Sequence, residues 1–494
     1  MRIILFFLTV YSLIFAQVTG SSAIVSPISL AMGNSYVSSS RGFYSSGVNP
    51  ANLVYSKNNN FEMSTIFLPP SLNIAIGNNS LQLNDVIKYF TPIDSANILK
   101  PRRITKSDIS DINDLLKDNI NIFSNVNSGI FKIYYHYNDI YPSFAISLDE
   151  YIMTNTIFPK KLPLSLVNLS PLQKTDDVDL SSFDLKFWWL RSYSFSMGYT
   201  LNNFNFIKEL TKNINIDQID FGLGIKYISG FAYAGFDKNS ILFNHTNDTI
   251  SQKYEYNISI NNLSYISLSD NFGPEYDYKK ISIKTHIPKQ VFPKEAGRGY
   301  GFDFGLNFRF KKYHVFSFAL TDVGNIKWFK NTAKYSAIGS FKYSGLGKGN
   351  ISEIQDSLQR TLDTLDKFAP NDSFKSSLPT AIRIGYATQI NNLIDDFPGL
   401  MFFTFDFNIG LNNMPGNSKK ARISAGINWN ISEYLPYVRT GFSTGGLYGF
   451  MWSLGTGFES NFYTLDFAIV NLHELLQNNK ISKAIFSIGG KLRF

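Results

Sequence analysis

The sequence predicts an all-β protein, a transmembrane antiparallel up-and-down β-barrel of roughly 14–16 strands. Three observations favour this fold class. Many strand-length segments alternate large apolar residues with polar ones, 44 Phe and 28 Tyr occur among the 494 residues, and the chain ends on an aromatic residue, Phe494. A barrel strand presents every second side chain to lipid, so this alternation indicates a protein whose main solvent is the bilayer.

Residues 1–16 have the features of a secretory signal peptide. Arg2 is followed by a mostly apolar run over residues 3–15 and then by small residues, beginning with Ala16. The run is too short to cross a bilayer, which takes about 20 apolar residues in a helix. We expect cleavage after Ala16, or as late as Gly20; an uncleaved N-terminal anchor is the alternative. The expected location is the outer membrane of a Gram-negative bacterium.

Residues 17–58 are predicted to form a plug-like segment, because they are too polar and too rich in Gly and Ser to cross a bilayer as a strand. The most specific feature of this segment is an Asn-Pro-Ala box at Asn49, Pro50 and Ala51. Such a box also forms an ordinary turn, since proline fixes φ and asparagine caps the turn. The sequence leaves both interpretations open.

Residues 59–494 are predicted to form the barrel wall. The clearest strand covers residues 301–310, where five large apolar side chains alternate with Gly, Asp, Gly, Asn and Arg. In a soluble sandwich these side chains would need a second sheet opposite them, whereas in a barrel they need only lipid. Comparable segments are residues 219–227, 403–411, 421–429, 448–458, 463–469 and 484–494, and weaker ones include residues 61–67 and 72–76. Turn residues separate neighbouring strands at Lys311–Lys312 and Met414–Asn417.

The polar residues on the other side of these strands are expected to face the lumen of the barrel. Wide barrels have a polar interior, so these residues should satisfy one another and water; lining a substrate path is the alternative role. The candidates are Asp220, Lys226, Asp303, Arg309, Asp406, Arg422 and Asp466.

Two stretches break the strand period and are predicted to be helices inserted in loops. Residues 350–369 place apolar side chains at three- and four-residue spacing, with Asn350 as the N-cap and Pro370 as the stop. Residues 107–120 show a second pattern of this kind. Each helix has one apolar face, so each should lie on an apolar surface, either covering a barrel mouth or acting as a gate.

Composition excludes several other classes of protein. A hydrophobic content of 44% and a mean hydropathy of −0.08 are too polar for a bundle of transmembrane helices. The net charge of +8 comes from scattered Lys and Arg rather than a basic stripe, so no nucleic-acid partner is expected. The absence of cysteine excludes a lipoprotein anchor and is compatible with export.

Catalysis finds little support in the sequence. None of the five histidines stands at a metal-binding spacing; they are His136, His245, His286, His314 and His473. The acidic group at residues 176–179 lacks the ordered spacing and the glycine of a calcium loop. We therefore expect no enzyme activity, no catalytic residues, no metal and no cofactor.

The Asn-Pro-Ala box, following the small-residue run of residues 29–42, resembles the N-terminal segment of FadL-like outer-membrane proteins. The resemblance extends to Asp303-Phe304-Gly305-Leu306, to residues 318–328 and to Leu378-Pro379-Thr380, which are similar to Bacteroidetes-type relatives of FadL, including PorV-like proteins and an uncharacterised family. It implies that the N-terminal segment is a hatch inside the barrel. It also implies that hydrophobic substrates leave the lumen through a lateral opening. The glycine that follows the box in that family is Asn52 here.

Two functions are compatible with these features. The first is a channel or carrier for small hydrophobic molecules, which the resemblance to FadL implies. The second is a barrel that transports nothing and docks a secretion-system or surface protein, as the resemblance to PorV implies. In both cases the expected partners include outer-membrane lipids and the barrel-assembly machinery.

Overall fold

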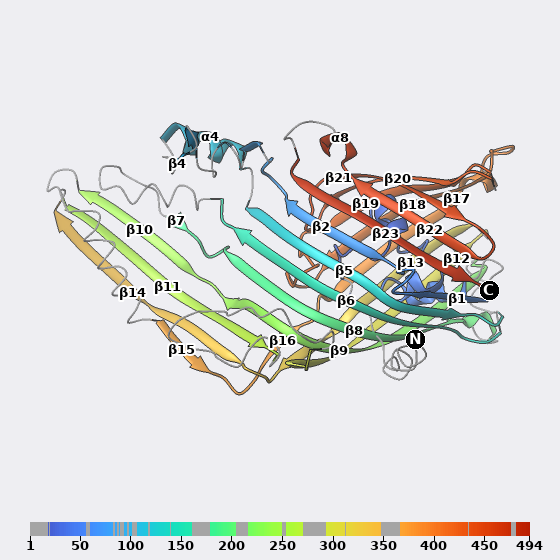
Figure 1. Ribbon diagram of the computed structural model, residues 1–494, viewed down its shortest axis with the longest axis horizontal. Coiled ribbons are helices and arrows are strands. Elements are labelled where there is room, and N and C mark those ends of the chain that lie inside the picture. The colour runs from blue at the N-terminus through green and yellow to red at the C-terminus, as the bar shows by residue number, and fades with distance from the viewer. Residues whose placement is uncertain are drawn as a thin grey trace.

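The structure is a computed structural model that describes residues 18–494 apart from single residues and short segments. The exceptions are residues 19, 56–59, 83, 86–87, 89–92, 96–97, 101–105, 117–118, 139, 161–177, 204–215, 249–252, 270–292, 312, 347–365, 433 and 476–480. The described chain forms a large antiparallel sheet that closes on itself around the N-terminal segment (Figure 1).

The closed ring has fourteen strand positions among the described residues, and β1 and β2 share the first of them. In order around the ring the strands are β1 (Phe61–Thr65) with β2 (Leu72–Asn78), β5 (Ile120–Tyr135), β6 (Ser143–Phe158), β8 (Asp184–Thr200), β9 (Gln218–Lys238), β12 (Gly297–Phe310), β13 (His314–Trp328), β17 (Ala381–Gln389), β18 (Leu400–Gly410), β19 (Arg422–Asn430), β20 (Tyr437–Gly445), β21 (Met451–Glu459), β22 (Tyr463–Val470) and β23 (Lys483–Arg493). Strand β23 pairs with both β1 and β2 and so closes the ring. The predicted all-β barrel of 14–16 strands is confirmed.

Further strands extend the sheet beyond the ring at one end of the barrel (Figure 1). The far half of β9 pairs with β11 (Lys253–Leu268), which pairs in turn with β10 (Ile241–Asp248) and β14 (Ala333–Leu346). We call these three strands the extension. The shorter elements are β3 (Ile93–Ser95), β4 (Ile98–Lys100), β7 (Val178–Asp179), β15 (Asp366–Pro370), β16 (Phe374–Ser377), α4 (Lys106–Leu115), α8 (Leu472–Leu475) and the 3₁₀ turns η3 (Leu201–Asn203) and η5 (Ile390–Asn392).

The two predicted loop helices have different outcomes. Helix α4 covers most of the first one, but it ends at Leu115, and Ile120 already begins β5. Of the second, residues 350–365 lie outside the described residues, and residues 366–369 belong to strand β15. That part of the helix prediction is wrong, because backbone pairing of β15 with β14 overrides the local helical spacing.

The two ends of the barrel differ in the length of their connections. At the short-turn end, residues 311–313 join β12 to β13 and residues 460–462 join β21 to β22. At the long-loop end, residues 79–119 separate β2 from β5 and residues 411–421 separate β18 from β19. The last residue lies at the short-turn end, where the carbonyl of Phe494 accepts a hydrogen bond from the N–H of Phe61 at 3.2 Å.

The wall has an apolar outer face and a polar inner face, as strand alternation requires. On β12, Phe302 is 57% exposed on the outside while its neighbour Asp303 is 2% exposed on the inside. Outward aromatic rings meet across neighbouring strands at two levels, near Tyr193, Tyr227 and Tyr300 and near Phe310, Phe316 and Tyr386. Such bands are typical of the interfacial girdles of membrane barrels. No helix in the described part of the chain is long and apolar enough to cross a bilayer.

The N-terminal segment fills the inside of the ring, where Figure 1 shows it in blue. We call residues 18–55 the plug. Its elements are α2 (Pro27–Ala31), η1 (Gly42–Ser45) and η2 (Pro50–Val54). The plug begins beside the loop at residues 416–418 of the long-loop end and leads into β1 at the short-turn end. Its apolar side chains are buried, with Phe43, Tyr44 and Leu53 all at 0% exposure.

Candidate functional site

The Asn-Pro-Ala box starts η2 and also holds it against the wall. Asn49 is the N-cap, because its Oδ1 accepts a hydrogen bond from the N–H of Ala51 at 3.2 Å, and Pro50 takes the first helical position. Both choices follow ordinary helix-start preferences. In addition, Asn49 Nδ2 donates to Asn307 Oδ1 on β12 at 2.7 Å. The box therefore acts both as a turn and as a contact between plug and wall.

Three glycines on adjacent wall strands make room for the box. Gly198, Gly222 and Gly305 are paired with one another across β8, β9 and β12. A Cβ added at Gly222 or Gly305 would collide with the backbone or the asparagine of the box. The alternation of the sequence predicts only that Gly222 and Gly305 lie on the inner side of the wall. The signal that could have revealed their role is their alignment at one level on three neighbouring strands.

Asn52 stands where the resemblance implies a glycine. Its Nδ2 donates to the carbonyl of Val37 at 2.8 Å and to Ser40 Oγ at 2.6 Å. Its Oδ1 accepts from Asn307 Nδ2 at 2.9 Å. Asn52 lies in the 3₁₀ turn η2 and does not have a positive φ, so its backbone does not require glycine. The departure from the family pattern adds contacts within the plug and to the wall.

Two of the predicted lumenal residues bind the backbone of the plug. Asp406 Oδ2 on β18 accepts hydrogen bonds from the N–H groups of Tyr36 at 2.6 Å and Val37 at 2.9 Å. Arg422 Nη2 on β19 donates to the carbonyl of Asn34 at 3.1 Å. The sequence reasoning missed Arg383 on β17, whose Nη2 donates to the carbonyl of Gly20 at 2.9 Å. Charge-assisted bonds of this kind are stronger than neutral ones.

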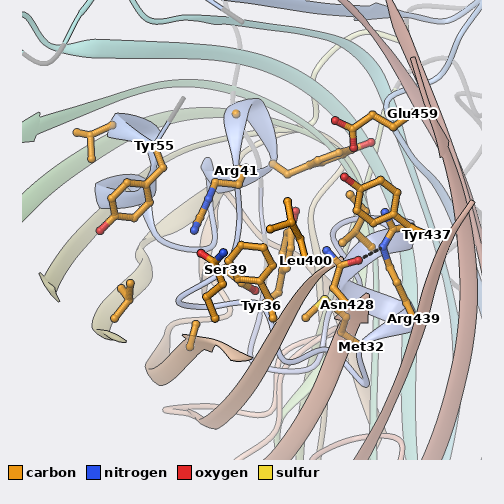
Figure 2. Close-up of a pocket in the computed structure, with 18 of the residues that line it drawn as sticks. Met32, Tyr36, Ser39, Arg41, Tyr55, Leu400, Asn428, Tyr437, Arg439 and Glu459 are labelled. Carbon is orange, nitrogen blue, oxygen red and sulfur yellow. Dashed lines mark hydrogen bonds between the residues drawn. The ribbon is translucent and has the colours of Figure 1, made fainter. Parts of the chain in front are cut away.

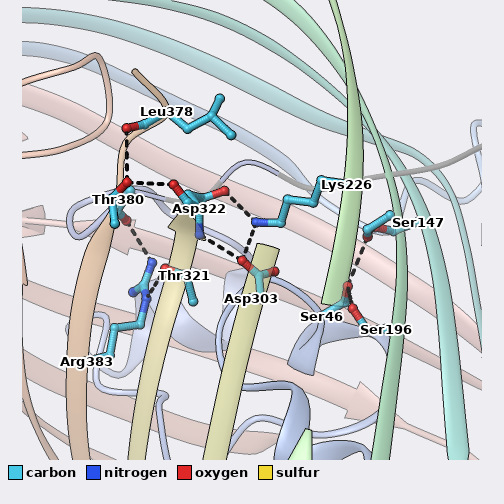
Figure 3. A network of polar contacts seen from close by, with 12 residues as sticks. Ser46, Ser147, Ser196, Lys226, Asp303, Thr321, Asp322, Leu378, Thr380 and Arg383 are labelled. Atoms are coloured by element: carbon cyan, nitrogen blue, oxygen red, sulfur yellow. Dashed lines mark hydrogen bonds and ion pairs between the residues drawn. The ribbon is translucent and has the colours of Figure 1, made fainter. Parts of the chain in front are cut away.

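A second group of predicted lumenal residues pairs within the wall (Figure 3). Lys226 Nζ lies 2.8 Å from Asp303 and 2.5 Å from Asp322, and all three side chains are fully buried. Asp322 was not predicted; it has a φ of 58° at the irregular pairing between β12 and β13, where its N–H donates to Asp303 at 2.8 Å. Asp466 pairs with Arg439 at 2.7 Å. These ions are matched within the protein, which is the role expected of a polar interior.

A cavity of about 550 Å³ lies between the plug and the wall at the short-turn end (Figure 2). We call it the vestibule. Tyr55 of the plug and Arg309 of β12 both line it, and the Tyr55 hydroxyl donates to Asp220 Oδ2 at 2.7 Å. Burial and the neighbouring Asp220 carboxylate raise the pKa of Tyr55, so its hydroxyl remains a donor. Tyr55 therefore links two of the predicted lumenal residues, because its hydroxyl bonds to Asp220 behind the lining and its ring lies against Arg309 in the lining.

The wall is interrupted in the first strand position. Between Thr65 and Leu72 stand six residues, whereas the facing stretch of β5 has only two residues between its corresponding partners. The extra residues form a turn, and the carbonyls of Pro69 and Ser71 still accept hydrogen bonds from the N–H groups of Gly490 on β23 and Gly129 on β5. Pro69 and Pro70 lie in this segment and have no N–H to donate to a neighbouring strand. The carbonyl of Pro70 accepts a hydrogen bond from the Tyr44 hydroxyl of the plug at 2.5 Å. We call residues 66–71 the interruption.

The interruption faces both the membrane and the plug. Ile66 and Phe67 are 62% and 88% exposed on the outside of the barrel. On the inside, Pro70 is buried against Gly129 and Gly489 of the flanking strands. The regular strand pairing of the wall is therefore broken at one place, between an exposed apolar tip and the plug.

Toward the long-loop end the lumen is lined by apolar side chains. Val18 of the plug packs there with inward-facing residues of the wall and with Met414 of a loop. The buried wall residues of this cluster include Tyr151, Trp188, Leu190, Ile228, Ile326 and Trp328. A water-filled porin channel would be polar at this place.

The described residues contain no group of three or more His, Asp or Glu side chains placed to hold a metal ion. His136 Nδ1 lies 2.7 Å from Ser143 Oγ, and His314 Nδ1 lies 2.8 Å from the Tyr386 hydroxyl. These are two separate contacts: His136 follows the end of β5, and His314 begins β13. His286 lies outside the described residues.

Residues 58–463 match the model of a family described as a family of unknown function, DUF5723. No curated protein matches the sequence.

The structure aligns with several solved structures over most of its length. The toluene transporter TbuX of Ralstonia pickettii aligns over 95% of this chain and 98% of its own, with 11% identity and a TM-score of 0.43. A FadL homologue of Pseudomonas aeruginosa aligns over 97% and 99%, with 10% identity and a TM-score of 0.43. The P. putida toluene transporter TodX aligns over 95% and 98%, with 9% identity and a TM-score of 0.41.

Proposed function

The chain belongs to the family of unknown function DUF5723, and we propose that this member is an outer-membrane conduit for small apolar molecules. The closed ring and its apolar outer face support placement in a bilayer. Membrane barrels have short periplasmic turns and longer extracellular loops, which would place the short-turn end in the periplasm. The vestibule then opens toward the periplasm, and the extension reaches outside the cell.

The observation that carries the proposal is the interruption next to the plug. A porin needs only an open polar lumen, but here the chain fills its own lumen and breaks the regular strand pairing of its wall at one place. The Tyr44 hydroxyl joins these two features by its bond to Pro70. An apolar molecule that reaches the lumen can enter the bilayer here, because Ile66 and Phe67 present an apolar surface on the outside.

The apolar cluster near the long-loop end supports the same function. Its Trp188, Leu190 and Trp328 side chains are buried inside the barrel rather than turned to lipid. An apolar molecule that enters from outside would be transferred from water to this surface, at a gain of about 25 cal/mol per Å² of apolar area buried. A displacement of Val18 and the rest of the plug would open the way from the cluster to the interruption.

Locking the plug to the wall tests this function. Ser46 Oγ of the plug lies 2.8 Å from Ser196 Oγ of β8 (Figure 3), and the chain has no cysteine of its own. A disulfide between Ser46→Cys and Ser196→Cys should therefore form cleanly. Uptake of a radiolabelled small hydrocarbon by whole cells should fall when the disulfide forms and recover when it is reduced.

The matched control locks two wall strands to each other. Ser424 and Ser443 are directly paired on the wall strands β19 and β20, and neither hydroxyl has a hydrogen-bond partner among the described residues. The disulfide between Ser424→Cys and Ser443→Cys should leave uptake unchanged.

Uptake should also fall on removal of the gene and return with the wild type but not with a deletion of residues 40–53. Equal uptake in the locked and reduced plug variants, or in cells with and without the gene, would refute transport.

One observation favours the second function, the docking of a partner protein. In the extension, β10 pairs with β11 along its whole length, but on its other side it pairs with β7 at only two positions among the described residues. An open strand edge of this kind can accept a strand from another protein. Affinity purification from gently solubilised outer membrane separates the two functions. A stoichiometric partner that is lost when residues 241–248 are deleted would favour docking.

A further inference from the structure

We infer that the vestibule is a binding site for a phosphate group, held between Arg41 of the plug and Arg309 of the wall. Inorganic phosphate and the phosphate of an amphipathic ester share this chemistry. Binding at this place does not depend on transport, so the site goes beyond the proposed function.

Five basic side chains line the vestibule. Three of them have carboxylate partners: Arg439 with Asp466 at 2.7 Å, Lys491 with Glu62, and Arg493 with Glu459. The remaining two are Arg41 and Arg309, and among the described residues neither forms an ion pair with a carboxylate. The vestibule therefore contains two guanidinium groups whose charge is not matched at contact distance.

Both guanidinium groups lie against the same aromatic ring. The Cζ of Arg41 is 4.6 Å from the centre of the Tyr55 ring, and the Cζ of Arg309 is 4.2 Å from it. The two charges are therefore no farther apart than the sum of these distances. One belongs to the plug and the other to β12, so a single anion bound by both would connect plug and wall.

The donors of these two arginines are largely unused. Arg41 Nη1 donates to the carbonyls of Ser38 and Ser40, at 3.4 and 2.7 Å. Arg309 Nε is buried and has no hydrogen-bond partner among the described residues. A guanidinium group carries five N–H donors, so most of the donors of this pair remain available. Leaving buried donors unsatisfied is unfavourable, and an oxyanion would satisfy them.

Asp220 is the carboxylate that acts electrostatically on Arg309 from within the wall. Its oxygens accept hydrogen bonds from Tyr55, Thr200 and Gln218, so Asp220 acts on Arg309 through its charge and leaves the guanidinium donors of Arg309 free. Its bond to Tyr55 fixes the ring against which both guanidinium groups lie. Asp220 thus positions the two arginines without occupying their donors.

A phosphate group fits two arginines better than a carboxylate does. It carries a charge of about −1.5 to −2 at neutral pH and three acceptor oxygens, whereas a carboxylate carries one charge and two oxygens. A bidentate guanidinium already satisfies a carboxylate, but a phosphate monoester can accept from both arginines. The rest of the lining includes Ile28, Val54, Leu400 and Phe402, which can accommodate a short apolar chain. The volume of about 550 Å³ is within the range of small-molecule sites.

Calorimetry on the full mature protein in a neutral maltoside detergent, at constant ionic strength, tests the site. The probes are inorganic phosphate, butyl phosphate and butyrate. We expect saturable binding of both phosphates and a Kd for butyrate at least about tenfold weaker. Tighter binding of butyl phosphate than of inorganic phosphate would identify an amphipathic ester as the ligand; equal or weaker binding would identify free phosphate.

Variants separate this site from general anion binding. Arg309→Gln and Arg41→Gln should each raise the Kd for phosphate at least about tenfold. Arg309→Lys keeps the charge but loses the planar guanidinium group, so its Kd should lie between those of the glutamine variants and the wild type. Arg298→Gln is the matched control, because Arg298 lies on the same strand, is exposed, and pairs with Glu295 at the other end. Heat-modifiable gel migration checks that each variant forms a barrel. Absence of saturable phosphate binding, wild-type affinity in the folded Arg309→Gln variant, or equal affinity for butyrate would overturn the assignment.

Discussion

Replacing Asp406 with asparagine should loosen the plug without breaking the wall. In the wild type one carboxylate oxygen accepts two hydrogen bonds from plug N–H groups, those of Tyr36 and Val37. Hydrogen bonds to a charged group contribute about 1.5–3 kcal/mol each, and neutral ones about 0.5–1.5 kcal/mol. Asp406→Asn keeps the shape and an acceptor oxygen but removes the charge, so we expect a loss of about 2 kcal/mol. This corresponds to an increase of about thirtyfold in the equilibrium constant for release of the plug.

Single-channel recording in planar bilayers measures this effect. Openings should occupy a larger fraction of the recording in Asp406→Asn than in the wild type, by about thirtyfold if the plug opens in one step. Asp149→Asn is the control, because Asp149 is also buried but pairs with Lys132 of the wall at 3.0 Å. This control should lower barrel stability without a comparable rise in openings. Equal openings in Asp406→Asn and wild type would show that these two bonds do not hold the plug in place.

Three further predictions concern the wall. Gly222→Ala should unseat the box, because its Cβ would collide with the plug backbone; protease cleavage within the plug should become faster, and unchanged cleavage would contradict this. Lys226→Met should lower the unfolding free energy in urea by about 3–5 kcal/mol, because Asp303 and Asp322 would be left buried and unpaired; adding asparagine at both aspartates should recover part of this loss. Phe67→Lys places a charge on the lipid face and should destabilise insertion by up to about 2–4 kcal/mol, depending on its depth in the bilayer; insertion into vesicles equal to wild type would contradict its contact with lipid.

The barrel was predictable because one local rule, alternation, repeats along the wall. Over residues 299–310 of β12 each inward Gly, Asp, Asn or Arg is followed by an outward aromatic or leucine, and the structure keeps this period. The same rule distinguished inward from outward side chains at Asp220, Lys226 and Asp406, which are all buried. It could not assign their partners, because a partner depends on which distant strands become neighbours.

The features that were missed depend on contacts between distant segments. Residues 366–369 have helical spacing, but pairing with β14 makes them a strand. Alternation predicts separate strands at residues 61–67 and 72–76, whereas the two segments share one position in the ring, interrupted where Pro69 and Pro70 have no N–H to donate. The partner of Arg383 is the carbonyl of Gly20 in the plug, and the partner of Asp322 is Lys226 on β9. Both partners are distant in the sequence, so local alternation could not indicate them.

The pairing of β1 with β23 has a consequence for the order in which the molecule assembles. Glu62 and Lys491 form a buried ion pair although they are 429 positions apart in the chain. Contacts between residues so far apart in the chain form late in folding, because the entropy cost of closing a long loop comes before their favourable interaction energy. The residues of the plug are synthesised early, yet the chamber that holds them is complete only when the last strand joins the first. Loss of the final strand would therefore leave an open sheet with two bare edges and a plug without its enclosure.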